Sequence, residues 1–279
     1  LAALGDPHKK LRFVHVAGTN GKGSTAAMLA SCLQAAGYRV GLYTSPFINR
    51  FNERIQVNGE QIPDDALVRL VEQVRPAADA MADVPTEFEI ITALGMLWFA
   101  EEKCDIVVLE VGLGGTLDST NVIDPPECAV ITALGMDHVK ELGPAIADIA
   151  AAKAGILKPG CTLVCYPDQP KDALEVITTA AEQAGVKLVV PDKEDLNLEQ
   201  AKPLKNLIDY GGYQVRLRMP GRHQAYHAAM AVEVALALWR DFGYEISDEA
   251  ILDGLAAASM PACMEVLRRH PLLLLDGGH

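Results

Sequence analysis

The sequence is poor in aromatic and basic residues and has no long apolar run. Only 5% of its 279 residues are Phe, Trp or Tyr, and 24 Lys and Arg stand against 37 Asp and Glu, for a formal net charge of -13. Nucleic acids and anionic membranes bind basic surfaces, so this excess of acid argues against both as partners. No stretch approaches the roughly 18 apolar residues of a membrane span, and no basic-apolar signal segment opens the chain. We therefore expect a cytoplasmic protein.

Paired cysteines are also scarce, which argues against a zinc site. The chain has six cysteines, most of them inside apolar runs, and only Cys161 and Cys165 are close together. No second cysteine or histidine pair stands beside them, so we interpret the cysteines as small core residues. Half of the residues are hydrophobic, which together with the low aromatic share suits helices packed on a buried sheet. The composition favours an α/β fold.

Strand and helix patterns alternate over residues 11–191. Residues 105–112 (DIVVLEVG) are almost continuously apolar, as in a parallel strand that is buried on both faces. The alternation predicts a doubly wound, mostly parallel sheet. The expected strands cover residues 12–17, 39–43, 105–112, 128–134, 161–166, 186–191, 213–221 and 271–275, and the expected helices cover 22–36, 64–82, 87–102, 144–154, 172–184, 223–242 and 247–258. The strand at 271–275 either joins this sheet or begins a second domain, and Pro261 is the expected boundary.

The stretch HVAGTNGKGS ends in a glycine-rich turn between an expected strand and an expected helix. Such a turn points backbone N–H groups at one concavity, and the helix N-terminus adds partial positive charge, so phosphate fits there. Lys22 would reach the β and γ phosphates, and Ser24 or Thr25 could face a magnesium ion. Val16 and Gly23 replace the first glycine and the hydroxyl of the usual P-loop, so this is a variant. The alternatives are a turn that binds nothing and a dinucleotide site, which fits less well without G-x-G-x-x-G.

Further candidate residues stand at the expected strand ends. Glu110 closes one strand and His138 follows another, so both should face the ligand crevice at the carboxyl edge of the sheet, where Glu110 could hold magnesium. Sequence alone favours a structural role for a lone loop histidine. Lys153 ends a helix, where a lysine is favourable without any function. Residues 43–55 form either a substrate lid or a packed loop, and Arg50 and Arg54 in it would suit an acidic substrate.

Taken together, the motifs resemble the ATP-dependent Mur ligase superfamily, and most closely the folylpolyglutamate synthase/dihydrofolate synthase family. The motifs that carry the resemblance, in family order, are GTNGKGS at 18–24, TSPF..RFNERI at 44–55, EVGLGG.LD.TN at 110–121, G.DH..ELG at 135–143 and KAGI at 153–156. The resemblance implies a central P-loop domain over residues 1–260, with residues 261–279 as the linker and first strand of a C-terminal α/β domain. It also implies ligation of L-glutamate to a folate or dihydropteroate carboxylate, driven by ATP and Mg²⁺ through an acyl phosphate, in a protein expected to be a monomer.

The resemblance also implies roles for individual residues. Lys22, His138 and Lys153 would be catalytic, and Lys153 matches a lysine that is carbamylated in the family. The implied ATP-binding residues are Gly18, Thr19, Asn20, Gly21, Lys22, Gly23, Ser24, His227, Cys263 and Asp276. The implied magnesium ligands are Ser24, Ser45, Glu110, His138 and Lys153; the implied folate contacts are Thr86, Phe88, Leu117 and Ser119; and His279 would bind glutamate.

The chain departs from the family pattern at three positions. His227 stands where the family has asparagine, Cys263 where it has arginine before the M/F-E-V segment, and Thr116 where arginine is common. Most of the family's C-terminal domain and its first helix also have no counterpart in this sequence, which predicts a truncated or weakened enzyme. The competing interpretations are a Mur-type cell-wall amino-acid ligase and a P-loop module that binds ATP without ligase turnover.

Overall fold

The computed structural model describes residues 1–202 and 205–277 and is built around an eight-stranded sheet. The strand order is β4-β3-β2-β5-β1-β6-β7-β8. Strands β2, β5, β1, β6, β7 and β8 run parallel, whereas β3 and β4 add an antiparallel hairpin beside β2. The bounds are β1 Phe13–Ala17, β2 Val40–Tyr43, β3 Ile55–Val57, β4 Glu60–Gln61, β5 Ile106–Glu110, β6 Cys128–Ile131, β7 Thr162–Cys165 and β8 Lys187–Val189. The prediction of a mostly parallel sheet is confirmed.

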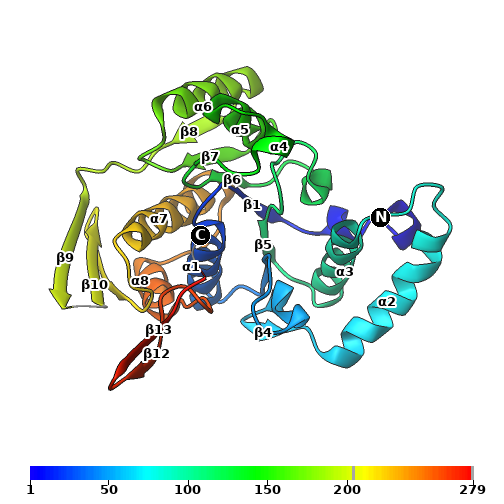
Figure 1. The fold of residues 1–279 in the computed structure, drawn as a ribbon, viewed down its shortest axis with the longest axis horizontal. Helices are drawn as coiled ribbons and strands as arrows, with labels where there is room; N and C mark the ends of the chain where they lie inside the picture. The colour runs from blue at the N-terminus through cyan, green and yellow to red at the C-terminus, as the bar shows by residue number, and fades with distance from the viewer. Residues whose placement is uncertain (203–204, 278–279) are drawn as a thin grey trace.

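Helices cover both faces of the sheet, as Figure 1 shows. On one face, Val14 and Val16 of β1 pack in a core with α1 (Lys22–Ala35), α7 (His223–Phe242) and α8 (Asp248–Ala257). On the other face, Phe13 packs with α2 (Asp64–Asp79) and α3 (Glu87–Glu101), and Ala17 with α5 (Ile146–Ala154) and α6 (Lys171–Ala184). Side chains of a strand alternate between faces, so continuous apolar strands fill both cores. The fold is therefore doubly wound.

Short helices connect these elements. They are the 3₁₀ helices η1 Ala2–Leu4, η2 Pro7–Lys10, η3 Phe51–Arg54 and η4 Ser119–Val122, and the short helix α4 Val139–Leu142. Helix α5 begins two residues later than the sequence predicted, because the Asp148 carboxylate accepts a hydrogen bond from the Ala145 N–H (3.0 Å) and makes Ala145 the N-cap. None of the helices in the described part of the chain combines the length and apolar character that crossing a bilayer requires.

Two smaller sheets lie outside the central one. Strands β9 (Leu196–Lys202), β10 (Lys205–Tyr210) and β11 (Tyr213–Leu217) form an antiparallel sheet, of which the sequence predicted only the last strand. Strands β12 (Glu265–Arg269) and β13 (Leu272–Leu275) form a separate antiparallel hairpin. Among the described residues, β13 pairs only with β12, so the first of the two alternatives, that it joins the central sheet, is wrong.

Several strand ends meet at one edge of the sheet. Val16 of β1 is in register with Glu110 of β5, and Ala17 is in register with Ile131 of β6. The chain leaves each of these strands in the same direction because they are parallel. The loops that follow β1, β5 and β6 therefore lie next to one another, as expected for the ligand crevice of an open α/β sheet.

Candidate active site

The glycine-rich turn after β1, residues 18–24, is called the phosphate loop below. It leaves β1 at Gly18, and α1 begins at Lys22, as the sequence predicted. The N–H groups of Thr19 and Asn20 both donate to the Ala133 carbonyl at 3.0 Å, which ties the loop to the end of β6. The first N–H groups of α1 have no acceptor within the helix, so they are the donors that remain for an anion.

The backbone of the phosphate loop is closely covered, which explains its glycines. Gly18 and Gly21 have positive φ values of 150° and 83°. A Cβ on Gly18 would overlap Thr132, and one on Gly21 would overlap the His227 ring. Glycine is needed at these two positions both for the backbone conformation and for the space.

Two lysines share the carbonyl of Gly18. Lys22 Nζ donates to the carbonyl oxygens of Gly18 and Thr19 at 3.1 and 3.3 Å, and Lys153 Nζ donates to Gly18 at 2.8 Å. Lys153 lies in the last turn of α5, as the sequence predicted, but it is only 5% exposed. Burial, aided by the Lys22 charge, lowers the pKa of Lys153 to about 8. An anion bound here would face two positive groups.

Glu110 brings a carboxylate to the same loop. Its side chain is 3% exposed and accepts a hydrogen bond from the Ser45 N–H at 3.1 Å. A Cβ on Gly23 would lie 3.6 Å from Glu110 Oε2, so the carboxylate faces the first turn of α1. Burial raises the pKa of Glu110 to about 7, against the charge of Lys22 and the Ser45 hydrogen bond. The structure thus brings Ser45, Glu110 and Lys22 together, three of the residues that the sequence placed in the site.

His138 lies less centrally. It precedes α4 with φ of 50°, its side chain is half exposed, and its Nε2 is 3.5 Å from Asp137 Oδ2. The segment is near the phosphate loop, because Thr19 Oγ1 donates to the Gly135 carbonyl at 3.2 Å. Within residues 1–202 and 205–277, no three His, Cys, Asp or Glu side chains group closely enough to hold a metal ion. Among the described residues, no hydrogen bond or ion pair links His138 to Glu110, so its place among the magnesium ligands stays a prediction.

A buried glutamine that the sequence analysis missed holds Ser24. Gln224 is 2% exposed, and its Nε2 donates to Ser24 Oγ at 3.3 Å, while its Oε1 lies 3.1 Å from His227 Nδ1. Burial lowers the pKa of His227 to about 3, so the ring is neutral and its Nδ1 carries the proton that Gln224 accepts. The position one turn before His227 in α7 is the only signal in the sequence that could have indicated Gln224.

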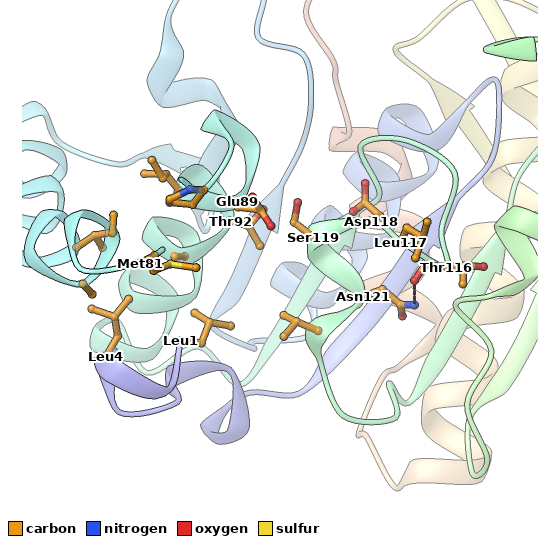
Figure 2. A pocket seen from close by; sticks show the side chains of 17 residues that line it. Leu1, Leu4, Met81, Glu89, Thr92, Thr116, Leu117, Asp118, Ser119 and Asn121 are labelled. Atoms are coloured by element: carbon orange, nitrogen blue, oxygen red, sulfur yellow. Dashed lines mark hydrogen bonds between the residues drawn. The ribbon is translucent and has the colours of Figure 1, made fainter. Parts of the chain in front are cut away.

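A pocket of about 450 Å³ opens beside the loop that follows β5. Figure 2 shows it between α3, which supplies Glu89 and Thr92, and the loop that carries Leu117, Asp118 and Ser119. This pocket, called the acceptor pocket below, is lined by Leu1, Leu4, Val74, Ala77, Ala78, Met81, Pro85, Glu89, Ile90, Thr92, Ala93, Thr116, Leu117, Asp118, Ser119, Asn121 and Val122. Most of these residues, Leu1 and Leu4 among them, carry no motif and could not have been found from the sequence.

Only two of the four expected folate contacts line the acceptor pocket. Leu117 and Ser119 do so. Thr86 instead caps α3, where its hydroxyl accepts from the Glu89 N–H at 3.2 Å. Phe88 packs edge-on against Tyr43, with 6.0 Å between ring centroids. Neither residue lines the pocket.

Comparison with known proteins identifies the family. The model of the Mur ligase middle domain matches residues 16–235. The dihydrofolate synthase/folylpolyglutamate synthase of Bacillus subtilis (strain 168) is 43% identical over 290 residues, which cover 100% of this chain and 67% of the relative. The folylpolyglutamate synthase of Lacticaseibacillus casei is 41% identical over 291 residues, with the same coverage. The chain belongs to the folylpolyglutamate synthase/dihydrofolate synthase family.

Solved structures agree with this assignment. A complex of folylpolyglutamate synthase with AMPPCP and folate matches with a TM-score of 0.92 at 40% identity, over 100% of this chain and 70% of that chain. The Mycobacterium tuberculosis folylpolyglutamate synthase complexed with ADP matches with a TM-score of 0.90 at 32% identity, over 100% of this chain and 64% of that chain. The family is one of ATP-dependent acid–amino-acid ligases, which confirms the enzyme class and fold class that the motifs indicated.

The three departures from the family pattern lie near the phosphate loop or the acceptor pocket. His227 packs over Gly21, and Cys263 Sγ lies 3.9 Å from Ser24 Oγ. Thr116 lines the acceptor pocket, and its N–H and hydroxyl both donate to the Ala152 carbonyl. Asp276 follows the β12–β13 hairpin and accepts from the Met264 N–H at 3.2 Å. His279 lies outside the described residues.

Proposed function

We propose that this family member binds ATP and magnesium at the phosphate loop and ligates L-glutamate to the carboxylate of a folate or dihydropteroate. One observation carries the proposal: Lys22, Lys153 and Glu110 converge on a glycine loop at the same sheet edge as a pocket of about 450 Å³. A lone glycine loop fits any nucleotide, but the pocket beside it adds room for a second substrate.

The nucleotide would use groups that are already in place. The first N–H groups of α1 and the Lys22 ammonium would bind phosphate oxygens, with Lys22 exchanging the carbonyls of Gly18 and Thr19 for the β and γ phosphates. Further contacts are proposed from His227 and Cys263, which flank the loop, and from Asp276.

The oxygen groups near α1 fit a magnesium ion. Magnesium prefers carboxylate and hydroxyl oxygens, and the buried Glu110 carboxylate with the Ser24 hydroxyl offers both. Ser45 lies against Glu110 and joins the proposed ligand set, whereas His138 enters it on the family resemblance alone. Bound magnesium would supply positive charge against the triphosphate. The protein's part is to hold these groups, with Gln224 fixing Ser24.

Lys153 is proposed to act as a carbamate. Burial lowers its pKa to about 8, so a fraction of the amine is neutral near pH 7 and can attack CO₂, with loss of one proton. The product would place an anionic oxygen ligand where the amine now contacts Gly18. Mass analysis of the intact protein in bicarbonate should then show one added carboxyl group, which Lys153→Arg abolishes. An unmodified Lys153 under these conditions would contradict this role.

The reaction needs two anions to meet. The acceptor carboxylate attacks the γ-phosphorus of ATP, which gives an acyl phosphate and ADP, and the positive charge of Lys22 offsets the repulsion between the reactants. The amine of glutamate then attacks the acyl carbon, phosphate leaves, and the amine loses a proton to form the amide. Water must be kept out while the acyl phosphate exists. Residues 1–260 are proposed as the ATP-binding domain, with 261–279 as the linker and first strand of the next, and with His279 at the glutamate.

Incubation with ATP, magnesium, L-glutamate and either pteroate or tetrahydrofolate tests the proposal. The expected product is the acceptor extended by one glutamyl residue, detected by mass, and Lys22→Ala should weaken ATP binding in calorimetry. Product formation only with UDP-muramoyl acceptors would favour a cell-wall ligase. ATP binding without any amide product would favour a simple nucleotide-binding module.

A further inference from the structure

Arg54, which the sequence indicated only as a group that would suit an acidic substrate, lies near the site residues Ser45 and Glu110. It ends η3 and immediately precedes β3. Its carbonyl accepts from the Thr44 N–H at 3.1 Å, and Ile55 is in register with Tyr43 of β2. The next residue after Thr44 is Ser45, whose N–H donates to Glu110. The backbone therefore fixes Arg54 beside the end of β2, close to the phosphate loop.

The guanidinium of Arg54 is held in place without an anionic partner. Its Nε is buried and has no hydrogen-bond partner, and the side chain forms no ion pair with a carboxylate of the described residues. Its Cζ lies 5.3 Å from the Phe47 ring centroid and 6.0 Å from that of Phe51, a cation-π arrangement that fixes the charge. A buried donor without an acceptor costs stability, so its retention points to a ligand that satisfies it.

Arg50 in the same segment provides a contrast. Its guanidinium is exposed and binds both oxygens of Asp64, at 2.9 and 3.1 Å. Arg50 is thus neutralised within the protein, whereas Arg54, four residues later, is not. The two arginines of the RFNERI segment therefore have different purposes.

Arg54 is also near residues of both the acceptor pocket and the phosphate loop. Beside it, Tyr43 donates to or accepts from Thr92 Oγ1 at 3.2 Å, and Thr92 lines the acceptor pocket. On the other side lies Glu110. Burial raises the pKa of Glu110, and the positive charge of Arg54 opposes this rise. An acceptor that fills the pocket and extends toward Lys22 would bring its reacting end past Arg54.

We propose that Arg54 is the receptor for the acceptor's reacting carboxylate, and so determines specificity for an anionic over a neutral acceptor end. The planar fork of a guanidinium matches both oxygens of a carboxylate, and the two phenyl rings hold the fork in one orientation. The carboxylate would satisfy the buried Nε–H. This inference rests on the proposed function.

Paired ligands test the inference directly. A reduced folate and its analogue with the reacting carboxyl converted to an amide are titrated into the protein with AMPPCP and magnesium. The native chain should bind the carboxylate about 10- to 100-fold more tightly than the amide. Arg54→Gln should abolish this preference, and Arg54→Lys, which keeps the charge but not the fork, should retain part of it. The control Arg50→Gln should leave the preference intact.

The outcomes separate this inference from the proposed function. AMPPCP affinity and the melting temperature, measured on every variant, show whether the fold survives. If Arg54→Gln unfolds, the preference is measured on Arg54→Lys instead. A full preference for the carboxylate in a folded Arg54→Gln protein would overturn the inference while glutamate conjugation still stood. Absence of any conjugate from the native chain would overturn the proposed function, whereas the binding preference would still report on Arg54.

Discussion

The phosphate loop and the acceptor pocket lie at the same sheet edge but are built in opposite ways. Around the loop, the side chains of Lys153, Gln224 and His227 are 5%, 2% and 4% exposed, and glycine backbone is covered by packed neighbours. Around the pocket, Leu117 is 98% exposed and Met81 is 54% exposed. The loop is therefore backed by buried side chains, whereas much of the pocket is free surface.

This difference separates stability from recognition. A change at the phosphate loop disturbs groups that are buried and hydrogen-bonded to distant strands, so it should affect both folding and nucleotide binding. A change at an exposed pocket residue removes no contact in the free protein, so it should affect substrate binding alone. Four changes test this difference, of which the first should have the strongest effect and the last the weakest.

Gly18→Ala should have the largest effect. The added methyl would overlap Thr132 at a backbone φ of 150°. We expect the free energy of unfolding to fall by about 3 kcal/mol and ATP affinity to fall at least about 100-fold, because the loop must shift. Urea unfolding and calorimetry measure both. Gly37→Ala, also at positive φ but with open space around it, is the control and should leave ATP affinity unchanged.

Lowering the pH should destabilise the fold through His15, a buried histidine that connects β1 to the loop after β5. His15 is fully buried, and its Nε2 lies 2.8 Å from Thr120 Oγ1, whose proton goes to Asp118, so the ring must be the neutral donor. Burial lowers the pKa of His15 from 6.5 to about 3. The unfolded chain then binds the proton more readily, and stability present above pH 6.5 is lost as the pH falls toward 3.

The slope attributable to His15 should be at most about 1.4 kcal/mol per pH unit. Urea unfolding between pH 7 and pH 5 measures it. His15→Gln keeps a donor but not the titrating ring, so its stability should depend less on pH than that of the native chain, whereas His138→Gln removes an exposed histidine as the control. Equal slopes for His15→Gln and the native chain would show that His15 is not responsible.

The sequence predicted the sheet because parallel strands buried on both faces leave a simple pattern. The run at β6 is apolar throughout and that at β5 is apolar up to Glu110, and the glycines before α1 mark the phosphate loop. Strand β10 was missed although Ile208 and Tyr210 are buried in the core, because the buried face also carries the polar Asn206 and the chain around it is rich in polar residues. Hydrophobic periodicity indicates burial, and it fails where a polar residue occupies a buried position.

Site residues were predictable where motif and strand end coincide, as for Lys22 and Glu110. The burial of Lys153 could not be predicted, because a lysine in the last turn of a helix has the same local sequence whether it faces solvent or a neighbouring loop. The pairing of Gln224 with Ser24 joins residues 200 positions apart. The different fates of Arg50 and Arg54 likewise depend on Asp64 and two phenyl rings that only the fold brings into place.

Leu117→Ala tests the exposed side of the comparison. Because Leu117 is 98% exposed, its truncation should change the free energy of unfolding by less than about 0.5 kcal/mol. A pteroyl ring that covers it would lose apolar contact, so KM for the acceptor should rise about 3- to 10-fold with the KM for ATP unchanged. Val68→Ala, at an exposed site on α2 outside the pocket, is the control. A large loss of stability would place Leu117 in the core after all.

Cys263→Arg should have the smallest effect and acts at the border of the buried loop. Cys263 Sγ is 3.9 Å from Ser24 Oγ, and Cys263 also lines an open groove of about 650 Å³, so a longer side chain has space. A guanidinium there would meet the triphosphate at its exposed side, and screening by solvent limits the gain to about 3- to 5-fold in ATP affinity. Calorimetry measures this gain against Cys263→Ser, which adds no charge. An unchanged affinity for Cys263→Arg would mean that the bound triphosphate lies out of reach of position 263, on the side of the loop that Lys153 and Gly18 close.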